Sequence, residues 1–330
     1  MEKNRKKQHG RALAAALLAL LLGASPAWAA ERTLVPLGQT VGIELCTPGA
    51  MVVGLAADGS PAGRAGVRTG DLITEIDGRQ VRSAEDFTAA LASAAQTVTL
   101  TLERGGRTLR VTVSPDRTPE GNKLGLWLRS SITGIGTVTF VDPETGWYGA
   151  LGHPVSDAET GQPLPLGSGC ITDTEIVAVR RGLGGQPGEL CGSVDTANVR
   201  GTVLCNTDCG LFGYLQGETA GEAVPVAAEE EIVPGRAQLL CSVRGRETAA
   251  YDIRIDQVRR GELRTLCFTV EDPELLAHTG GIVQGMSGSP ILQNGKLIGA
   301  VTHVLVNDPT RGYGVSITRM LASGEAAAAA

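Results

Sequence analysis

The chain has 330 residues, of which 45 are glycine and only 3% are aromatic, and it carries a formal net charge of −6. That length accommodates two domains and a targeting segment, because a typical domain takes roughly 100–200 residues. The acidic balance excludes the basic surface of a nucleic-acid-binding protein, and the abundant glycine favours short strands and tight turns over long helices.

The first 29 residues predict an export signal. Five basic residues open the chain: Lys3, Arg5, Lys6, Lys7 and Arg11. An apolar run from Ala12 to Leu22 follows, and Ala27-Trp28-Ala29 supplies the small residues of a cleavage point. A membrane-spanning helix needs about 20 apolar residues. We therefore expect residues 1–29 to form a signal peptide cleaved after Ala29, with retention as an N-terminal membrane anchor as the alternative.

A first module is expected over residues 30–115. The string from Ser60 through Gly70-Asp71-Leu72-Ile73 to Ile76-Asp77-Gly78 resembles the signature of PDZ domains. Ser83 and Asp86 then predict a capped helix start, because a serine three residues before an acidic residue can satisfy free backbone N–H groups.

The PDZ resemblance implies a peptide-binding site. Such a domain adds an extended peptide to a sheet edge, and backbone N–H groups hold the terminal carboxylate of the peptide. The resemblance implies that four residues provide this cradle: Gly42, Ile43, Glu44 and Leu45.

The second half of the chain has a different character. Residues 116–123 combine proline, glycine and polar side chains, which predicts a linker. Over residues 124–323, short apolar runs alternate with glycine and proline, which predicts a β-sandwich or β-barrel. The alanine-rich residues 324–330 are expected to form a disordered tail.

Seven cysteines lie beyond the export segment, and their odd number argues against a fully disulfide-paired framework. Only Cys205 and Cys209 lie close together, and the chain has neither a second close pair nor an H-E-x-x-H string. Free buried thiols are therefore expected. The sequence predicts no metal site and no cofactor.

The string Gly285-Met286-Ser287-Gly288-Ser289-Pro290 places a serine in a glycine-flanked tight turn ahead of an apolar strand. In such a turn a hydroxyl stands exposed while backbone N–H groups converge, as an acyl-transfer nucleophile requires. The following Asn294-Gly295 pair predicts a two-residue hairpin. Ser287 is the candidate nucleophile, and Ser289 is the alternative.

A serine hydroxyl needs a base that takes its proton, and the chain has four histidines: His9, His153, His278 and His303. His9 lies in the export segment, His278 lies in a polar segment, and His303 ends the strand after the Asn-Gly pair. His153 follows a strand end and a glycine, which combines access with a fixed orientation. Spacing therefore favours His153 as the general base.

The residue pattern leaves the acid of a triad open among four aspartates: Asp157, Asp252, Asp256 and Asp272. Asp157 is close to His153 along the chain, but proximity along a loop does not aim it at the ring. Asp272 precedes Pro273, so a helix N-cap is a second interpretation of that residue.

The serine string resembles the G-D-S-G-G-P motif of chymotrypsin-like serine proteases. Together with Gly152-His153-Pro154 and the strings around His303 and Gly312-Tyr313-Gly314, it more closely resembles the SpoIVB peptidases, sporulation serine proteases that carry a PDZ domain. The resemblance implies a mainly β chain, in which a PDZ domain precedes a chymotrypsin-like double β-barrel protease domain. It also implies that Asp272 is the acid, which gives His153, Asp272 and Ser287 the chain order of chymotrypsin.

In the implied mechanism Ser287 attacks a peptide carbonyl, His153 transfers the proton, and the N–H groups of Gly285 and Ser287 hold the oxyanion. The resemblance further implies export to the forespore intermembrane space, self-cleavage, and cutting of a membrane-bound regulatory protein, which activates processing of the sigma-K precursor in the mother cell. The alternative hypothesis is a PDZ peptide-binding scaffold with an inactive protease-like fold.

Overall fold

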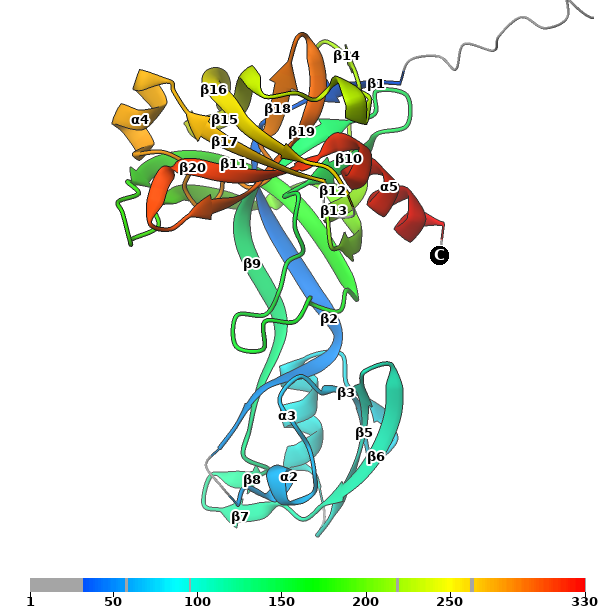
Figure 1. Cartoon of the computed structure of the whole chain (residues 1–330). Coiled ribbons are helices and arrows are strands. Elements are labelled where there is room, and N and C mark those ends of the chain that lie inside the picture. The colour runs from blue at the N-terminus through cyan, green and yellow to red at the C-terminus, as the bar shows by residue number, and fades with distance from the viewer. Residues whose placement is uncertain (1–31, 57–58, 95, 218–219, 262–263, 330) are drawn as a thin grey trace, which may run out of the picture. The chain divides into compact units, whose positions relative to one another are not determined.

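The structure is a computed structural model that describes residues 32–56, 59–94, 96–217, 220–261 and 264–329. The predicted export signal, residues 1–29, lies outside them. Within the described part of the chain, no helix is long and apolar enough to cross a membrane. Strands make up most of the elements (Figure 1), so the mainly β prediction is confirmed.

Antiparallel pairing closes six strands into a first barrel. In ring order they are β2 (Thr40–Leu55), β9 (Leu126–Val141), β10 (Trp147–Ala150), β13 (Gly210–Leu215), β12 (Glu189–Thr207) and β11 (Ser168–Arg180), which pairs with β2 again. The short strands β1 (Thr33–Pro36) and β14 (Val224–Pro225) extend the sheet from β9. Leu45, Tyr148 and Ile171 are fully buried in its core, because alternate strand residues face inward.

A second closed barrel, yellow to red in Figure 1, follows in the chain. Its strands in ring order are β15 (Gly235–Arg244), β16 (Glu247–Arg259), β17 (Thr265–Val270), β20 (Asp308–Ser316), β19 (Lys296–Leu305) and β18 (Pro290–Gln293). Asn294 and Gly295 have φ of +52° and +76° and join β18 to β19, so the predicted two-residue hairpin is confirmed. The 3₁₀ turn η1 (Glu229–Glu231) precedes this barrel, and α4 (Pro273–Thr279) connects β17 to the serine turn.

The PDZ-like module is inserted between β2 and β9. Its elements are α2 (Pro61–Arg64), β3 (Leu72–Ile76), β4 (Arg79–Gln80), α3 (Ala84–Ala92), β5 (Val98–Arg104) and β6 (Arg107–Val113). β2 pairs with β11 through Cys46 and with β3 at Ala50 and Met51, so one strand serves both barrel and module. We predicted a complete PDZ domain from residue 30 ahead of the protease domain. This prediction is wrong at its start, because residues 33–46 belong to the sheet of the first barrel.

The predicted linker, residues 116–123, is also wrong. Those residues form the paired strands β7 (Asp116–Thr118) and β8 (Gly121–Lys123). The amide of Asn122 donates to the Leu91 and Ala94 carbonyls at 3.1 Å, which satisfies the C-terminal end of α3. Leu124 is buried in the hydrophobic core of the module, so residues 116–124 belong to it.

The end of the chain is helical where we expected a disordered tail. Helix α5 runs from Ile317 to Ala328, and the Ser316 hydroxyl caps it by accepting from the Arg319 N–H. Met320 and Leu321 are buried against the first barrel, and Gly324 packs on the ring of Phe212. Alanine has the highest helix propensity, and buried contacts anchor the first turns, so residues 324–328 continue the helix.

The predicted PDZ carboxylate cradle is not formed by Gly42, Ile43, Glu44 and Leu45. These residues pair with β9 on one side and with β11 on the other. A backbone that is hydrogen-bonded along both edges has no free N–H groups for a ligand. The assignment is therefore wrong, and the four residues are barrel strand.

Candidate active site

The turn that carries Ser287 is held between the two barrels. The Thr137 hydroxyl on β9 donates to the Gly285 carbonyl at 2.8 Å, and the Thr137 N–H donates to the Ser287 carbonyl at 3.0 Å. On the other side, the Gly288 N–H donates to the Val301 carbonyl on β19 at 2.8 Å. Gly288 has φ of +96°, and a Cβ there would lie 2.0 Å from the Thr137 carbonyl oxygen, so only glycine fits.

His153 follows β10 through a backbone bend in which Leu151 and Gly152 both have positive φ. Its Nδ1 lies 2.8 Å from the Pro154 carbonyl oxygen. Because a carbonyl can only accept, Nδ1 carries the hydrogen and Nε2 keeps its lone pair, the tautomer that a general base needs. Burial lowers the pKa of His153, the Pro154 hydrogen bond opposes that shift, and the neighbouring His303 lowers the pKa further.

One cavity of about 290 Å³ contains both Ser287 and His153. Gly285 and Gln284 also line it, together with aliphatic side chains that include Ile43, Ile135 and Leu151. The Ser287 hydroxyl donates to the Thr302 carbonyl at 2.9 Å. The structure therefore brings three predicted site residues, Gly285, Ser287 and His153, to one place, with the serine hydroxyl resting on a main-chain acceptor.

The backbone N–H groups of the serine turn differ in whether they donate to a main-chain carbonyl. The N–H groups of Met286, Gly288 and Ser289 donate to main-chain carbonyls. Those of Gly285 and Ser287 have no acceptor among the residues that the structure describes. Two unused N–H groups at positions i−2 and i of a serine nucleophile are the donors that an oxyanion requires.

Ser289, the alternative nucleophile, is completely buried, and its hydroxyl has no hydrogen-bond partner within the described residues. It does not line the cavity that contains His153. A substrate carbonyl cannot reach a hydroxyl that is closed off from solvent. The geometry thus favours Ser287.

Asp272 is the N-cap of α4. One carboxylate oxygen accepts from the Leu275 N–H at 2.9 Å, and the other accepts from the Asp252 N–H at 3.3 Å. Burial raises the pKa of Cys241, and the charge of Asp272 raises it further, whereas no carboxylate contributes to the shifted pKa of His153. The helix-cap interpretation is confirmed, and no contact between Asp272 and His153 is found in the described residues.

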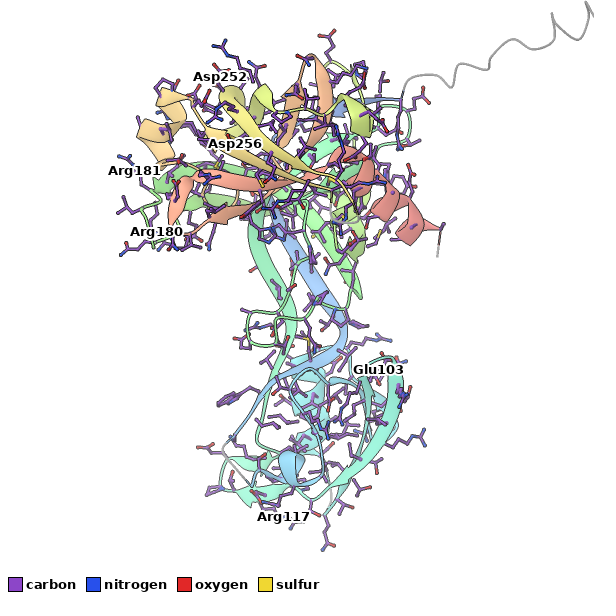
Figure 2. All side chains as sticks on the ribbon, in the orientation of Figure 1. Glu103, Arg117, Arg180, Arg181, Asp252 and Asp256 are labelled. Carbon is purple, nitrogen blue, oxygen red and sulfur yellow. The ribbon has the colours of Figure 1, made fainter. Side chains whose placement is uncertain are left out.

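None of the other three candidate aspartates contacts His153 in the part of the chain that the structure describes. Asp157 is fully buried and pairs with Arg129 while its second oxygen accepts two turn N–H groups. Asp252 and Asp256 lie on β16 (Figure 2), and Asp256 accepts from the Thr269 hydroxyl at 2.6 Å. The titratable residue beside His153 is instead His303, and the centres of the two rings are 5.0 Å apart.

His303 is a neighbour of the site that was not expected from the sequence. It lies on β19 directly after Thr302, whose carbonyl holds the Ser287 hydroxyl. Strand β19 forms one wall of the serine turn because Val301 both donates to and accepts from that turn. The signal in the sequence was the position of His303 near the end of the second strand of the Asn294-Gly295 hairpin, which follows the Ser287 turn.

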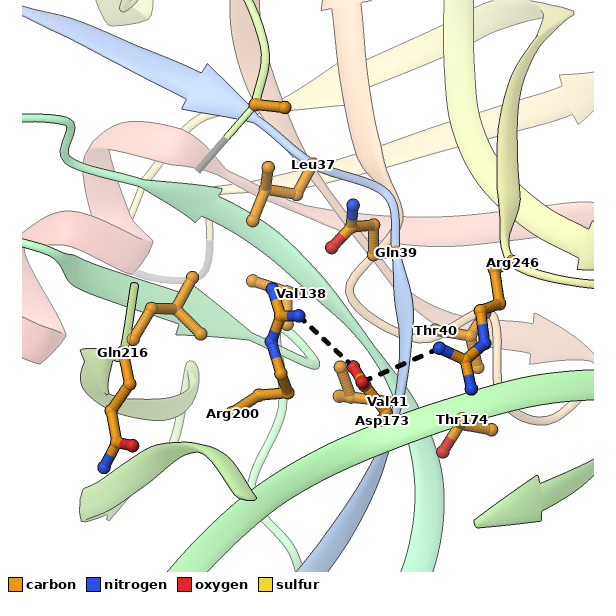
Figure 3. Close-up of a pocket in the computed structure, with 12 residues that line it drawn as sticks. Leu37, Gln39, Thr40, Val41, Val138, Asp173, Thr174, Arg200, Gln216 and Arg246 are labelled. Carbon is orange, nitrogen blue, oxygen red and sulfur yellow. Dashed lines mark ion pairs between the residues drawn. The ribbon is translucent and has the colours of Figure 1, made fainter. Parts of the chain in front are cut away.

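A second cavity, of about 220 Å³, contains an ion-pair cluster (Figure 3). Asp173 lies 3.6 Å from an Arg200 nitrogen and 3.7 Å from an Arg246 nitrogen. No histidine, cysteine or serine lines it. It therefore offers no pairing of nucleophile and base, and the cavity at Ser287 remains the candidate active site.

The double barrel, with a serine turn and a histidine in one cavity, defines a serine peptidase of the chymotrypsin-like fold. A family model described as SpoIVB peptidase S55 matches residues 120–321, and a PDZ domain model matches residues 52–104. The first match covers more than half of the chain, so the chain belongs to the SpoIVB peptidase S55 family. The predicted family and fold class are confirmed.

Solved structures show partial similarity. The PDZ domain of the SdrC-like protein from Listeria monocytogenes is 27% identical, with a TM-score of 0.22, and the match covers 24% of this chain and 87% of that one. The active form of the Rv3671c protease from M. tuberculosis is 14% identical over 59% and 73% of the two chains, with a TM-score of 0.33. The thermostable serine protease AL20 from an extremophilic microorganism is 12% identical over 61% and 92%, with a TM-score of 0.35.

A curated relative, "Putative zinc metalloprotease Atu1380" of Agrobacterium fabrum, is 36% identical over 108 residues. The match covers 32% of this chain and spans 28% of the length of that relative.

Proposed function

We propose that this protein is an exported serine endopeptidase that cleaves itself and a membrane-bound regulatory protein, and so signals from forespore to mother cell during sporulation and activates sigma-K precursor processing. The observation that carries the catalytic part is the shared cavity of Ser287 and His153, beside the unused N–H groups of Gly285 and Ser287. Family membership supports the sporulation role.

In the proposed reaction the Ser287 hydroxyl leaves the Thr302 carbonyl, gives its proton to Nε2 of His153, and forms a bond to the substrate carbonyl carbon. The carbonyl oxygen becomes an oxyanion held by the two free N–H groups. His153 then returns the proton to the leaving amine, and water repeats the sequence to release the acyl group. The Pro154 carbonyl keeps the imidazole in the required tautomer throughout.

One observation favours the second candidate, a peptide-binding scaffold without turnover. The Ser287 hydroxyl donates its hydrogen bond to the Thr302 carbonyl and not to the ring of His153. A fluorophosphonate probe distinguishes the two functions, because it forms a covalent adduct only with an activated serine. We expect stoichiometric labelling of Ser287, mapped by mass spectrometry. An unlabelled protein that still binds peptides would establish the scaffold.

The family resemblance implies that Asp272 is the acid of the triad, and this role has a direct test. Asparagine caps helices as well as aspartate does, so Asp272→Asn keeps the cap of α4 while it removes the charge and the acceptor of the Asp252 N–H. Because Pro154 already orients His153, we expect kcat to stay within about tenfold and the melting temperature to fall by no more than a few degrees. A fall of about 10⁴-fold, typical of a triad aspartate, would instead assign the acid role to Asp272 after a rearrangement of α4.

The cavity also predicts the preferred cleavage site. Apart from His153, the side chains around Ser287 that line the cavity are uncharged and mostly aliphatic, including Ile132, Ile135 and Val155. An unpaired charge in such surroundings costs several kcal/mol. We expect peptides with valine or leucine before the cut bond to have kcat/KM at least about 100-fold above peptides with lysine or aspartate there.

A pair of variants tests this assignment of the cavity. Ile135→Asp introduces a carboxylate into the lining and should raise the relative rate for lysine peptides. Val177→Asp is the matched control, because Val177 is exposed on β11 and lies outside the cavity. Equal specificity profiles for the two variants would mean that the substrate side chain binds elsewhere.

For the PDZ-like module we propose a peptide site along β9. Residues Leu126–Arg129 pair with β2 on one side. The pairing of β9 with β1 and β10 begins only at Val138, so within the described residues the other edge of 126–129 is unpaired, and α3 packs beside this strand. A strand edge next to a helix is the place where β-augmentation adds a peptide.

A further inference from the structure

We propose that His153, which lines the active-site cavity, and the neighbouring exposed His303 together form an inhibitory binding site for a divalent transition metal ion such as Zn²⁺. Neither the family nor the proposed reaction requires a metal. The proposal rests on the proposed function only in its inhibitory consequence, because binding itself can be measured without turnover.

The first observation is the separation of the two imidazole rings. Their centres are 5.0 Å apart and the ring planes are tilted by 36°. Two nitrogens that each bind zinc at about 2.0–2.1 Å lie roughly 3.3 Å apart in a tetrahedral site. Rings with this spacing can present one nitrogen each at that separation.

The second observation concerns the available lone pairs. His153 donates its Nδ1 hydrogen to the Pro154 carbonyl, which leaves Nε2 as the free ligand atom. A hydrogen bond from the other ring nitrogen to a backbone carbonyl is the usual support of a metal-binding histidine. His303 makes no side-chain hydrogen bond with the residues that the structure describes, so its nitrogens are uncommitted.

The two imidazoles are the only protein ligands of this site among the described residues, and water would fill the other positions. The Ser287 hydroxyl rests on the carbonyl of Thr302, the residue before His303, and it lines the same cavity as His153. No group of three or more histidine, cysteine, aspartate or glutamate side chains suited to a metal occurs in the described residues. The site is therefore a two-histidine site with solvent-filled positions, and we expect micromolar and readily reversible affinity.

Metal binding here would stop proton transfer. An ion on Nε2 of His153 occupies the lone pair that must accept the serine proton. The chelator EDTA would remove the ion and restore the base. The metal thus acts as a competitive ligand of the catalytic imidazole and takes no part in peptide hydrolysis.

The test is calorimetric titration of the full exported chain with Zn²⁺, after alkylation of accessible cysteines because Cys191 is exposed. Four proteins are compared: the unchanged chain, His153→Gln, His303→Gln and His278→Gln. His278 is the matched control because it lies on α4, its ring is hydrogen-bonded to the Val243 carbonyl on β15, and it does not line the cavity. We expect a Kd at least tenfold higher in the first two variants and unchanged in the third.

Equal Zn²⁺ affinity in the unchanged chain and in His303→Gln would overturn the proposal, as would an equal loss in His278→Gln. A second readout follows turnover of a peptide substrate with and without Zn²⁺. We expect inhibition that EDTA reverses and that requires at least tenfold more Zn²⁺ in His303→Gln, each protein being compared with its own metal-free rate. If the unchanged chain has no turnover, the proposed function fails, and calorimetry alone still decides the metal site.

Discussion

Replacement of Ser287 by alanine should reduce peptide turnover by about 10⁶-fold and abolish fluorophosphonate labelling, because the residual oxyanion donors and binding contacts cannot supply a nucleophile. The substitution removes one hydroxyl, which donates a hydrogen bond to the Thr302 carbonyl. That bond contributes about 0.5–1.5 kcal/mol in net stability. The variant should therefore remain folded, with a melting temperature within a few degrees of the unchanged chain.

The measurement combines kcat on an apolar peptide with a mass-spectrometric map of self-cleavage products. Ser289→Ala is the matched control, since its hydroxyl is fully buried and unpartnered in the described residues. Deleting such a group is close to neutral for folding, and we expect full activity. Hydrolysis that survives in Ser287→Ala but disappears in Ser289→Ala would transfer the nucleophile role to position 289.

The second large effect is expected for His153→Gln. Loss of the base of a serine–histidine pair costs about as much as loss of the serine, roughly 10⁶-fold in kcat. Glutamine retains a polar group of similar size, so the loss should reflect chemistry and not folding. Circular dichroism and thermal unfolding of the same samples would check this. His278→Gln, remote from the cavity, should keep the turnover of the unchanged chain.

The pH profile of the unchanged chain is a further test of the same assignment. A general base works in its neutral form, so kcat/KM rises with pH through the pKa of His153. Burial lowers that pKa below the ordinary imidazole value of about 6.5. The acid limb should therefore lie below pH 6.5, and activity should persist in mildly acidic solution. An acid limb well above pH 6.5 would indicate another base or a solvent-exposed imidazole.

Features of short range were well predicted. The hairpin at Asn294-Gly295, the cap of α3 at Ser83 and the cap of α4 at Asp272 depend on neighbouring residues, and each was visible in the sequence. The prediction failed where an uninterrupted strand belongs to two units. β2 runs through sixteen residues, and the only local mark of its passage from barrel to inserted module is the Pro48-Gly49 dipeptide at the register shift between Cys46 and Met51, which the prediction did not use.

The candidate nucleophile and its candidate base could be chosen from the sequence alone, because glycines around Ser287 and the strand end before His153 are local features that exposed catalytic groups require. Only the tertiary structure decided what surrounds them. Thr137 holds a turn 148 residues away, and His303, not a carboxylate, lies against His153. Such neighbours arise from strand pairing across two closed barrels, where partners distant in the chain meet only after the sheets have formed.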